Sequence, residues 1–135
     1  MTVKVVWHTT MSIDGYIADR NDSLDWAFGH DGWLVPHFDE IIASAGAVLI
    51  GRRMYDLGAT SLAEAKLYGG AYAGPVFVLT RRPPEESGDP AVVFVSTGAA
   101  DALAHARAAA SGKDVMVLGS SVASQCLTAA WSTNC

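Results

Sequence analysis

The sequence predicts an α/β protein of three layers, in which a mixed, mainly parallel sheet is flanked by helices on both faces. Short, wholly apolar runs alternate along the chain with segments of helical spacing. Such runs are typical of buried parallel strands, because both faces of those strands are covered. A chain of 135 residues fits one domain, so we expect residues 1–135 to form a single unit.

Five strands are expected from runs rich in β-branched and aromatic residues: Val3–Thr9, Ala47–Ile50, Val76–Thr80, Val92–Ser96 and Val115–Leu118. Helical spacing of apolar residues predicts helices over residues 34–45, 54–57, 102–111 and, after a Gly-Ser-Ser turn, to about residue 130. Gly46 is expected to end the first of these helices, and Thr97 to cap the third.

Composition and charge exclude several classes of function. Half of the residues are hydrophobic and the net charge is −5, so no basic stripe is available for nucleic acid. Cys126 and Cys135 do not have the spacing of a zinc site, and we expect free thiols and no metal. The sequence contains no evident signal peptide and no apolar run of the ~20 residues that a membrane helix needs. These features predict a cytoplasmic protein.

Three segments that follow expected strands carry small or basic residues, namely Gly51-Arg52-Arg53, Thr80-Arg81-Arg82 and Gly119-Ser120-Ser121. Ligands of open α/β sheets bind outside the carboxyl ends of the strands. A helix that begins there presents free N–H groups to an anion, and arginines add forked donors for phosphate. Together the three segments predict a site for a phosphorylated dinucleotide.

For any one segment alone, the alternative is equally good that the glycines only turn the chain and the arginines are solvated. The sequence has no Gly-x-Gly-x-x-Gly after its first strand, and no P-loop. The prediction therefore depends on all three segments lying in register at one edge of the sheet.

The loop that follows the first strand reads Thr10-Met11-Ser12-Ile13-Asp14-Gly15-Tyr16-Ile17-Ala18. On the residues alone, Asp14-Gly15 is best explained as a tight turn in which the carboxylate bonds its own backbone. The functional alternative places Ser12 and Asp14 over a heterocyclic ring, with Gly15 leaving room for it.

Taken in order, these segments resemble the dihydrofolate-reductase-like superfamily, and more closely its branch related to the C-terminal reductase domain of the riboflavin-biosynthesis bifunctional deaminase-reductase. The resemblance rests on the loop at residues 10–18, on Ser23-Leu24-Asp25-Trp26, and on three strand-containing stretches. These are the stretches at residues 48–55, 75–81 and 115–121. The resemblance spans roughly residues 3–130.

The resemblance implies a dihydrofolate-reductase-like fold, NADPH as cofactor, and hydride transfer to a small pteridine- or aminopyrimidine-like substrate. By position, it implies that the adenosine phosphate end of NADPH is bound by Gly51, Arg52, Arg53, Thr80 and Arg81. It implies that the pyrophosphate is bound by Gly119, Ser120, Ser121 and Val122. It places Ser12, Asp14 and Gly15 at the border of nicotinamide and substrate, with Thr9 and Thr10 beside the ring. Asp14 or water is the expected proton source.

Two departures from the family pattern matter for function. The carboxylate that dihydrofolate reductases carry on their first helix has no clean counterpart, because Asp39 does not align with it, so folate itself is not the expected substrate. Family members also continue after the last helix with further strands, which makes this a C-terminally shortened relative. We expect a homodimer to cover the open sheet edge. The alternatives are a non-catalytic dinucleotide-binding relative, or a protein of this fold with another ligand.

Overall fold

A computed structural model describes residues 3–21, 23, 38–60, 72–85 and 89–134 of the chain. In these residues five strands form one sheet in the order β1-β5-β2-β3-β4, and every neighbouring pair is parallel. The strands are β1 (Val5–Trp7), β2 (Ala45–Gly51), β3 (Val76–Leu79), β4 (Val92–Val95) and β5 (Asp114–Leu118). The predicted mainly parallel sheet is confirmed, and its described strands include no antiparallel pair.

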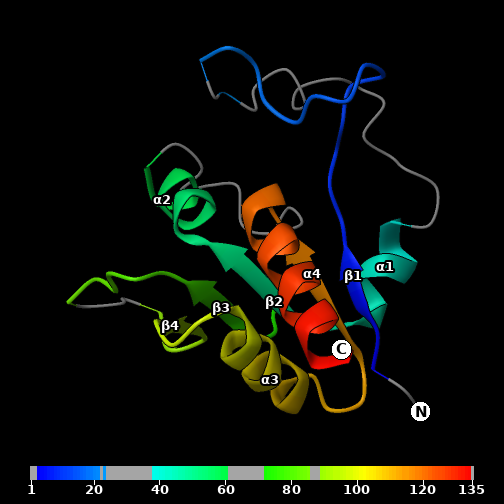
Figure 1. The fold of residues 1–135 in the computed structure, drawn as a ribbon, viewed down its shortest axis with the longest axis vertical. Helices are drawn as coiled ribbons and strands as arrows, with labels where there is room; N and C mark the ends of the chain where they lie inside the picture. Colours follow the sequence, from blue (N-terminus) through cyan, green and yellow to red (C-terminus); the bar gives the residue numbers. More distant parts are fainter. Residues whose placement is uncertain (1–2, 22, 24–37, 61–71, 86–88, 135) are drawn as a thin grey trace.

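Helices cover both faces of this sheet (Figure 1). They are α1 (Phe38–Ser44), α2 (Arg52–Thr60), α3 (Ala99–Ala109) and α4 (Ser120–Asn134). Helices α3 and α4 lie against each other on one face, whereas α1 and α2 lie on the other. This is the three-layer arrangement expected from the alternation of apolar strands and helices. No helix in the described ranges is long and apolar enough to cross a membrane.

Alternate residues of the central strands supply two separate hydrophobic cores. Leu49 and Val117 point to the α3 and α4 side, where Ala106 and Cys126 pack against them. Val48 and Met116 belong to the other core, together with partly buried residues of α1 and α2. Because side chains alternate between the two faces of a strand, a central strand buried on both faces must be apolar at every position. This explains the unbroken apolar run in β2.

Several element boundaries differ from the sequence prediction. Gly46 does not end a helix but lies inside β2, where a Cβ atom would collide with the carbonyl oxygen of Ala110 at the end of α3. Thr97 is not the cap of α3, because Gly98 occupies that position and Thr97 donates a hydrogen bond to the Asp101 carboxylate instead. Strand β1 is shorter than expected, and α2 begins directly at Arg52 and continues to Thr60.

Candidate functional site

The candidate site lies where the chain leaves two neighbouring strands toward opposite faces of the sheet. Strand β2 continues into α2 on one face, and its neighbour β5 continues into α4 on the other. In open α/β sheets the crevice outside the carboxyl ends of two such strands is where ligands bind. The glycines Gly51 and Gly119 stand at this point, one at the end of β2 and one directly after β5.

Strand register aligns the three predicted segments at the same edge. Ile50 pairs with Leu118, so Gly119 lies beside Gly51, and Gly51 in turn pairs with Leu79, the residue before Thr80. Because neighbouring strands are about 4.8 Å apart, the three strand ends span roughly 10 Å. The adjacency that the sequence analysis required is therefore present.

Gly119 has the backbone conformation that the turn into α4 requires. Its φ of 98° lies in the left-handed region, which residues with a side chain rarely adopt. Its carbonyl accepts a hydrogen bond from the N–H of Ala123 at 3.1 Å, the first bond of the helix. The first N–H groups of a helix have no partner within it, so those of Ser120, Ser121 and Val122 face the end of the helix. The hydroxyl-bearing residues Ser120 and Ser121 are exposed there.

Gly51 brings β2 close to the first turn of α4. A Cβ atom on Gly51 would lie 3.0 Å from Cγ2 of Val122, whose side chain is only 3% exposed. Of the residues predicted to hold a pyrophosphate, Val122 thus has a packing role: it seats the start of α4 against the end of β2. This contact fixes Gly119 relative to Gly51.

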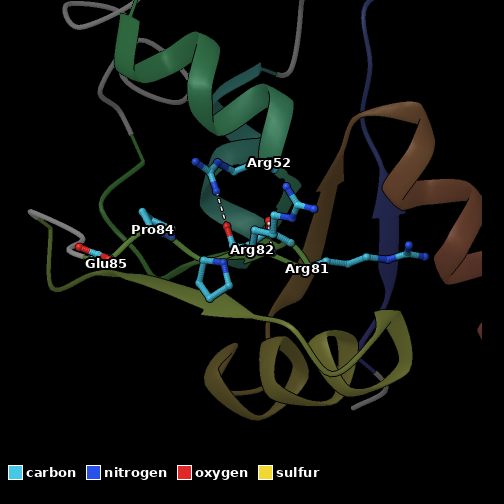
Figure 2. A pocket seen from close by; sticks show the side chains of 7 residues that line it. Arg52, Arg81, Arg82, Pro84 and Glu85 are labelled. Atoms are coloured by element: carbon cyan, nitrogen blue, oxygen red, sulfur yellow. Dashed lines mark hydrogen bonds between the residues drawn. The ribbon is translucent and has the colours of Figure 1, made fainter.

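Beside this crevice, the ends of β2 and β3 border an open pocket of about 570 Å³ (Figure 2). Its lining consists of Arg52, Thr80, Arg81, Arg82, Pro83, Pro84 and Glu85. Thr80 is buried, and its hydroxyl accepts a hydrogen bond from the N–H of Arg82 at 3.2 Å, which bends the chain at the pocket floor. Three predicted residues, Arg52, Thr80 and Arg81, therefore share one pocket.

Two hydrogen bonds hold the guanidinium of Arg52. Its Nε donates to Oδ1 of Asp56 at 2.8 Å, one helical turn further along α2. Its Nη1 donates to the main-chain carbonyl of Arg82, across the gap to the connection that follows β3 (Figure 2). A guanidinium has more N–H donors than these two bonds use, so further donors remain for an anion. Figure 2 also shows Arg81 pointing away from Arg52.

The pocket is locally cationic although the whole chain is acidic. Three arginines line it against one carboxylate, that of Glu85, and the Asp56 carboxylate bonded to Arg52 lies outside the lining, while the net charge of the chain is −5. Arg53 is exposed on α2 and does not line the pocket. Such a concentration of forked donors fits a phosphate group better than a neutral ligand.

The loop after β1 forms the tight turn that its sequence suggested. The Ser12 hydroxyl donates to Oδ1 of Asp14 at 2.6 Å and accepts from the N–H of Tyr16 at 3.0 Å. Gly15 has a φ of 92°, and its N–H donates to the carbonyl of Ser12. Neither Ser12 nor Asp14 lines the arginine pocket. Thr10 is exposed between β1 and this turn.

Arg82 belongs to a predicted segment but had no role of its own there, and Pro83, Pro84 and Glu85 were not predicted to be near a ligand, yet all four line the pocket. The signal that could have found them is their place directly after a buried strand, where ligand contacts concentrate. Within the described ranges, no group of three or more His, Cys, Asp or Glu residues could hold a metal ion.

Comparison with known proteins agrees with this architecture. A sequence profile of the RibD C-terminal domain matches residues 3–130 of the chain. A crystal structure of a Shewanella sp. PV-4 protein, provisionally assigned to riboflavin biosynthesis, superposes with a TM-score of 0.63 at 24% sequence identity. The match covers 88% of this chain but 65% of the other, so this chain spans less than two thirds of that protein. A search of curated proteins gave no match.

At this identity, the structural likeness establishes the fold alone, and it confirms the dihydrofolate-reductase-like fold predicted from the sequence. The matching profile describes a family of dinucleotide-binding reductase domains. The family is generally one of reductases, and the crevice outside β2 and β5 is the position at which open α/β sheets bind ligands.

Proposed function

This chain belongs to the RibD C-terminal domain family, and on that premise we propose that it is an NADPH-dependent reductase acting on a small pteridine- or aminopyrimidine-like heterocycle. One observation carries the proposal. The register of the strands places Gly119, Gly51 and Thr80 side by side at the carboxyl ends of β5, β2 and β3, next to a pocket lined by three arginines.

The arginine pocket is the proposed site for the adenosine phosphate end. Arg52, which is partly exposed, and Arg81, which is exposed, line this pocket together with the buried Thr80. A 2′-phosphate carries more negative charge than a ribose hydroxyl, so arginines at this place favour NADPH over NADH. Arg53 is proposed to add to the positive potential from outside the pocket.

The turn at Gly119 fits the pyrophosphate. A Cβ atom added to Gly119 would meet no other atom within 4 Å, so the space above this turn is open. The N–H groups that begin α4 point toward that space, and the helix dipole favours negative charge there. Gly119, Ser120, Ser121 and Val122 would therefore hold the pyrophosphate, with the hydroxyls of Ser120 and Ser121 as additional donors.

The carboxyl end of β1 leads into the proposed substrate side, with Thr10, Ser12 and Asp14. When bound, a nicotinamide cofactor supplies the hydride, and the protein contributes orientation and exclusion of water. We propose that Asp14, held by the Ser12 hydroxyl, lies beside the substrate and relays a proton to it, directly or through water. The Ser12–Asp14 bond would keep the carboxylate in one orientation.

A cofactor titration tests this function. We expect NADPH fluorescence to change saturably on addition of the protein, with weaker binding of NADH. Arg52→Ala should weaken NADPH binding by about 1.5–3 kcal/mol, the worth of a charged hydrogen bond, and leave NADH nearly unchanged. Arg53→Ala should have a smaller effect, because Arg53 lies outside the pocket. Absence of saturable NADPH binding at millimolar concentration contradicts the proposal.

A second candidate, a non-catalytic dinucleotide-binding relative, is favoured by one observation. The carboxylate of Asp14 and the hydroxyl of Ser12 bond each other within a local turn outside the arginine pocket. This candidate predicts NADPH binding without oxidation across pteridines and aminopyrimidines. Turnover of any of these substrates, lost in Asp14→Asn, decides for the reductase.

We further propose that the protein is a homodimer. Among the described residues, β1 pairs with β5 on one side only, and Trp7 at its end is 49% exposed. An edge strand presents main-chain N–H and C=O groups that can pair with a strand of another chain. Light scattering should give twice the mass calculated from the sequence, and Trp7→Lys should shift the protein toward monomer. A monomeric wild-type protein at micromolar concentration excludes the dimer.

A further inference from the structure

We infer that Asp56 is a positioning residue that selects for the phosphorylated cofactor by holding Arg52 in its binding orientation. The inference rests on the proposed function, because it concerns the same arginine pocket. It adds a residue that neither the sequence pattern nor the comparisons assign.

The geometry separates the two residues by role. Arg52 lines the pocket, whereas Asp56 does not, although its carboxylate oxygen lies 2.8 Å from Nε of Arg52. Asp56 therefore holds the guanidinium without itself bordering the space that a ligand would fill. Both side chains are partly exposed, at 38% for Arg52 and 51% for Asp56.

The second hydrogen bond of Arg52 shows the consequence of its contact with Asp56. With Nε fixed on α2, Nη1 reaches the carbonyl of Arg82 and spans the gap between the end of β2 and the chain after β3. An arginine side chain loses considerable rotamer freedom when it is fixed. Because the Asp56 carboxylate already fixes Arg52 in the folded protein, this conformational entropy is lost during folding. It is then not lost again when a phosphate binds.

Two opposite effects of Asp56 can be distinguished by experiment. Its charge weakens the positive potential of the pocket, so removal of that charge alone should strengthen the binding of any anion. Its hydrogen bond orients Arg52, so loss of the acceptor should weaken binding of the 2′-phosphate. Asp56→Asn removes the charge and keeps an acceptor oxygen, whereas Asp56→Ala removes both.

We expect Asp56→Ala to weaken NADPH binding about two- to five-fold, the range that an exposed ion pair supports, and to leave NADH binding unchanged or slightly tighter, because NADH feels only the loss of the negative charge. Asp56→Asn should bind NADPH as the wild type does or more tightly. In an Arg52→Ala background, Asp56→Ala should no longer weaken NADPH binding, because the orienting effect of Asp56 acts through Arg52 and only its charge effect remains. Asp101→Ala on α3 is the control for the change in net charge.

A second readout needs no cofactor. The Arg52 Nε–H signal in ¹⁵N NMR should exchange slowly with solvent in the wild type and faster in Asp56→Ala. Unchanged exchange overturns the inference, as does NADPH binding that Asp56→Ala leaves equal or makes tighter. It is also overturned if Asp56→Ala has the same effect with and without Arg52. If the wild type does not bind NADPH at all, the proposed function itself fails, and the exchange measurement shows whether Asp56 still holds Arg52.

Discussion

Substitution of Gly51 tests whether the first turn of α4 lies against the end of β2. A Cβ atom at this position would lie 3.0 Å from Cγ2 of Val122, whereas relaxed carbon contacts are about 3.5–4.0 Å. Val122 is 3% exposed and cannot turn into solvent. We therefore expect Gly51→Ala to lower the free energy of unfolding by about 1 kcal/mol, at the lower end of the range for overpacking.

The same substitution should have the opposite sign when Val122 is alanine. Val122→Ala alone should cost about 2 kcal/mol, from two buried methyl groups and the cavity they leave. With those methyls absent, the new methyl at position 51 meets no obstacle. The φ of Gly51 is not positive, so alanine fits this backbone and restricts the unfolded chain. Gly51→Ala should then stabilise the protein by about 0.4–1 kcal/mol.

Urea denaturation of the wild type, the two single variants and the double variant measures this coupling. We expect the effect of Gly51→Ala to differ by at least about 1 kcal/mol between the two backgrounds. Equal effects in both backgrounds would refute the reasoning, because they would show that Val122 does not press on Gly51. The crevice between β2 and β5 would then lack the contact that fixes its width.

Three further outcomes follow from the described residues. Gly119→Ala should lower the free energy of unfolding by about 1–2 kcal/mol. The positive φ of Gly119 is the whole cause, because the space around this residue is open. Gly119→Asn should cost less, and equal costs of the two variants in urea denaturation would contradict this. Burial lowers the pKa of His8, so below about pH 6.5 the unfolded chain binds a proton that the folded chain does not. Stability should therefore fall as the pH drops from about 6.5 toward that lowered pKa, and His8→Gln should flatten this part of the pH profile of the unfolding free energy; an unaltered profile would exclude His8 as the cause. Burial also raises the pKa of the Cys126 thiol. In a Cys135→Ser protein, Cys126 should therefore react slowly with a disulfide reagent in the folded state and quickly when the protein is unfolded in urea. A fast reaction in the folded state would show that Cys126 is accessible.

Local sequence predicted the strands and the glycine turns well because both depend on nearest neighbours. The run from Ala47 to Ile50 is apolar at every position and short, as is typical of a strand covered on both faces. Gly119 follows such a strand and precedes a helix, and its positive φ confirms the turn. The sequence also identified Asp14-Gly15 as a turn, which the bond from the Gly15 N–H to the Ser12 carbonyl confirms, although the Asp14 carboxylate accepts from the Ser12 hydroxyl and not from its own backbone.

The errors arose where a distant segment decides the local conformation. Gly46 is a residue type that often ends a helix, yet it lies within β2. The carbonyl of Ala110, far along the chain, packs so closely against it that a Cβ atom would not fit. The error at Thr97 is instead local and amounts to one residue, because Gly98 occupies the cap and Thr97 donates to the Asp101 carboxylate. The bond from Arg52 to the Arg82 carbonyl likewise joins two segments whose proximity no local pattern encodes.

Whether the three strand ends can serve one ligand depends on the position of β5. If β5 followed β4 at the outer edge of the sheet, Gly119 would lie three strand spacings, about 14 Å, from Gly51. Instead α3 lies against β2, β3 and β5 and returns the chain across the face, so that β5 enters between β1 and β2. Parallel crossovers are right-handed, and a return in this direction puts α3 on the face opposite α2, where α4 packs beside it. The pairing of Ile50 with Leu118 follows, and only this pairing brings the glycine turn of α4 next to the arginines at the ends of β2 and β3.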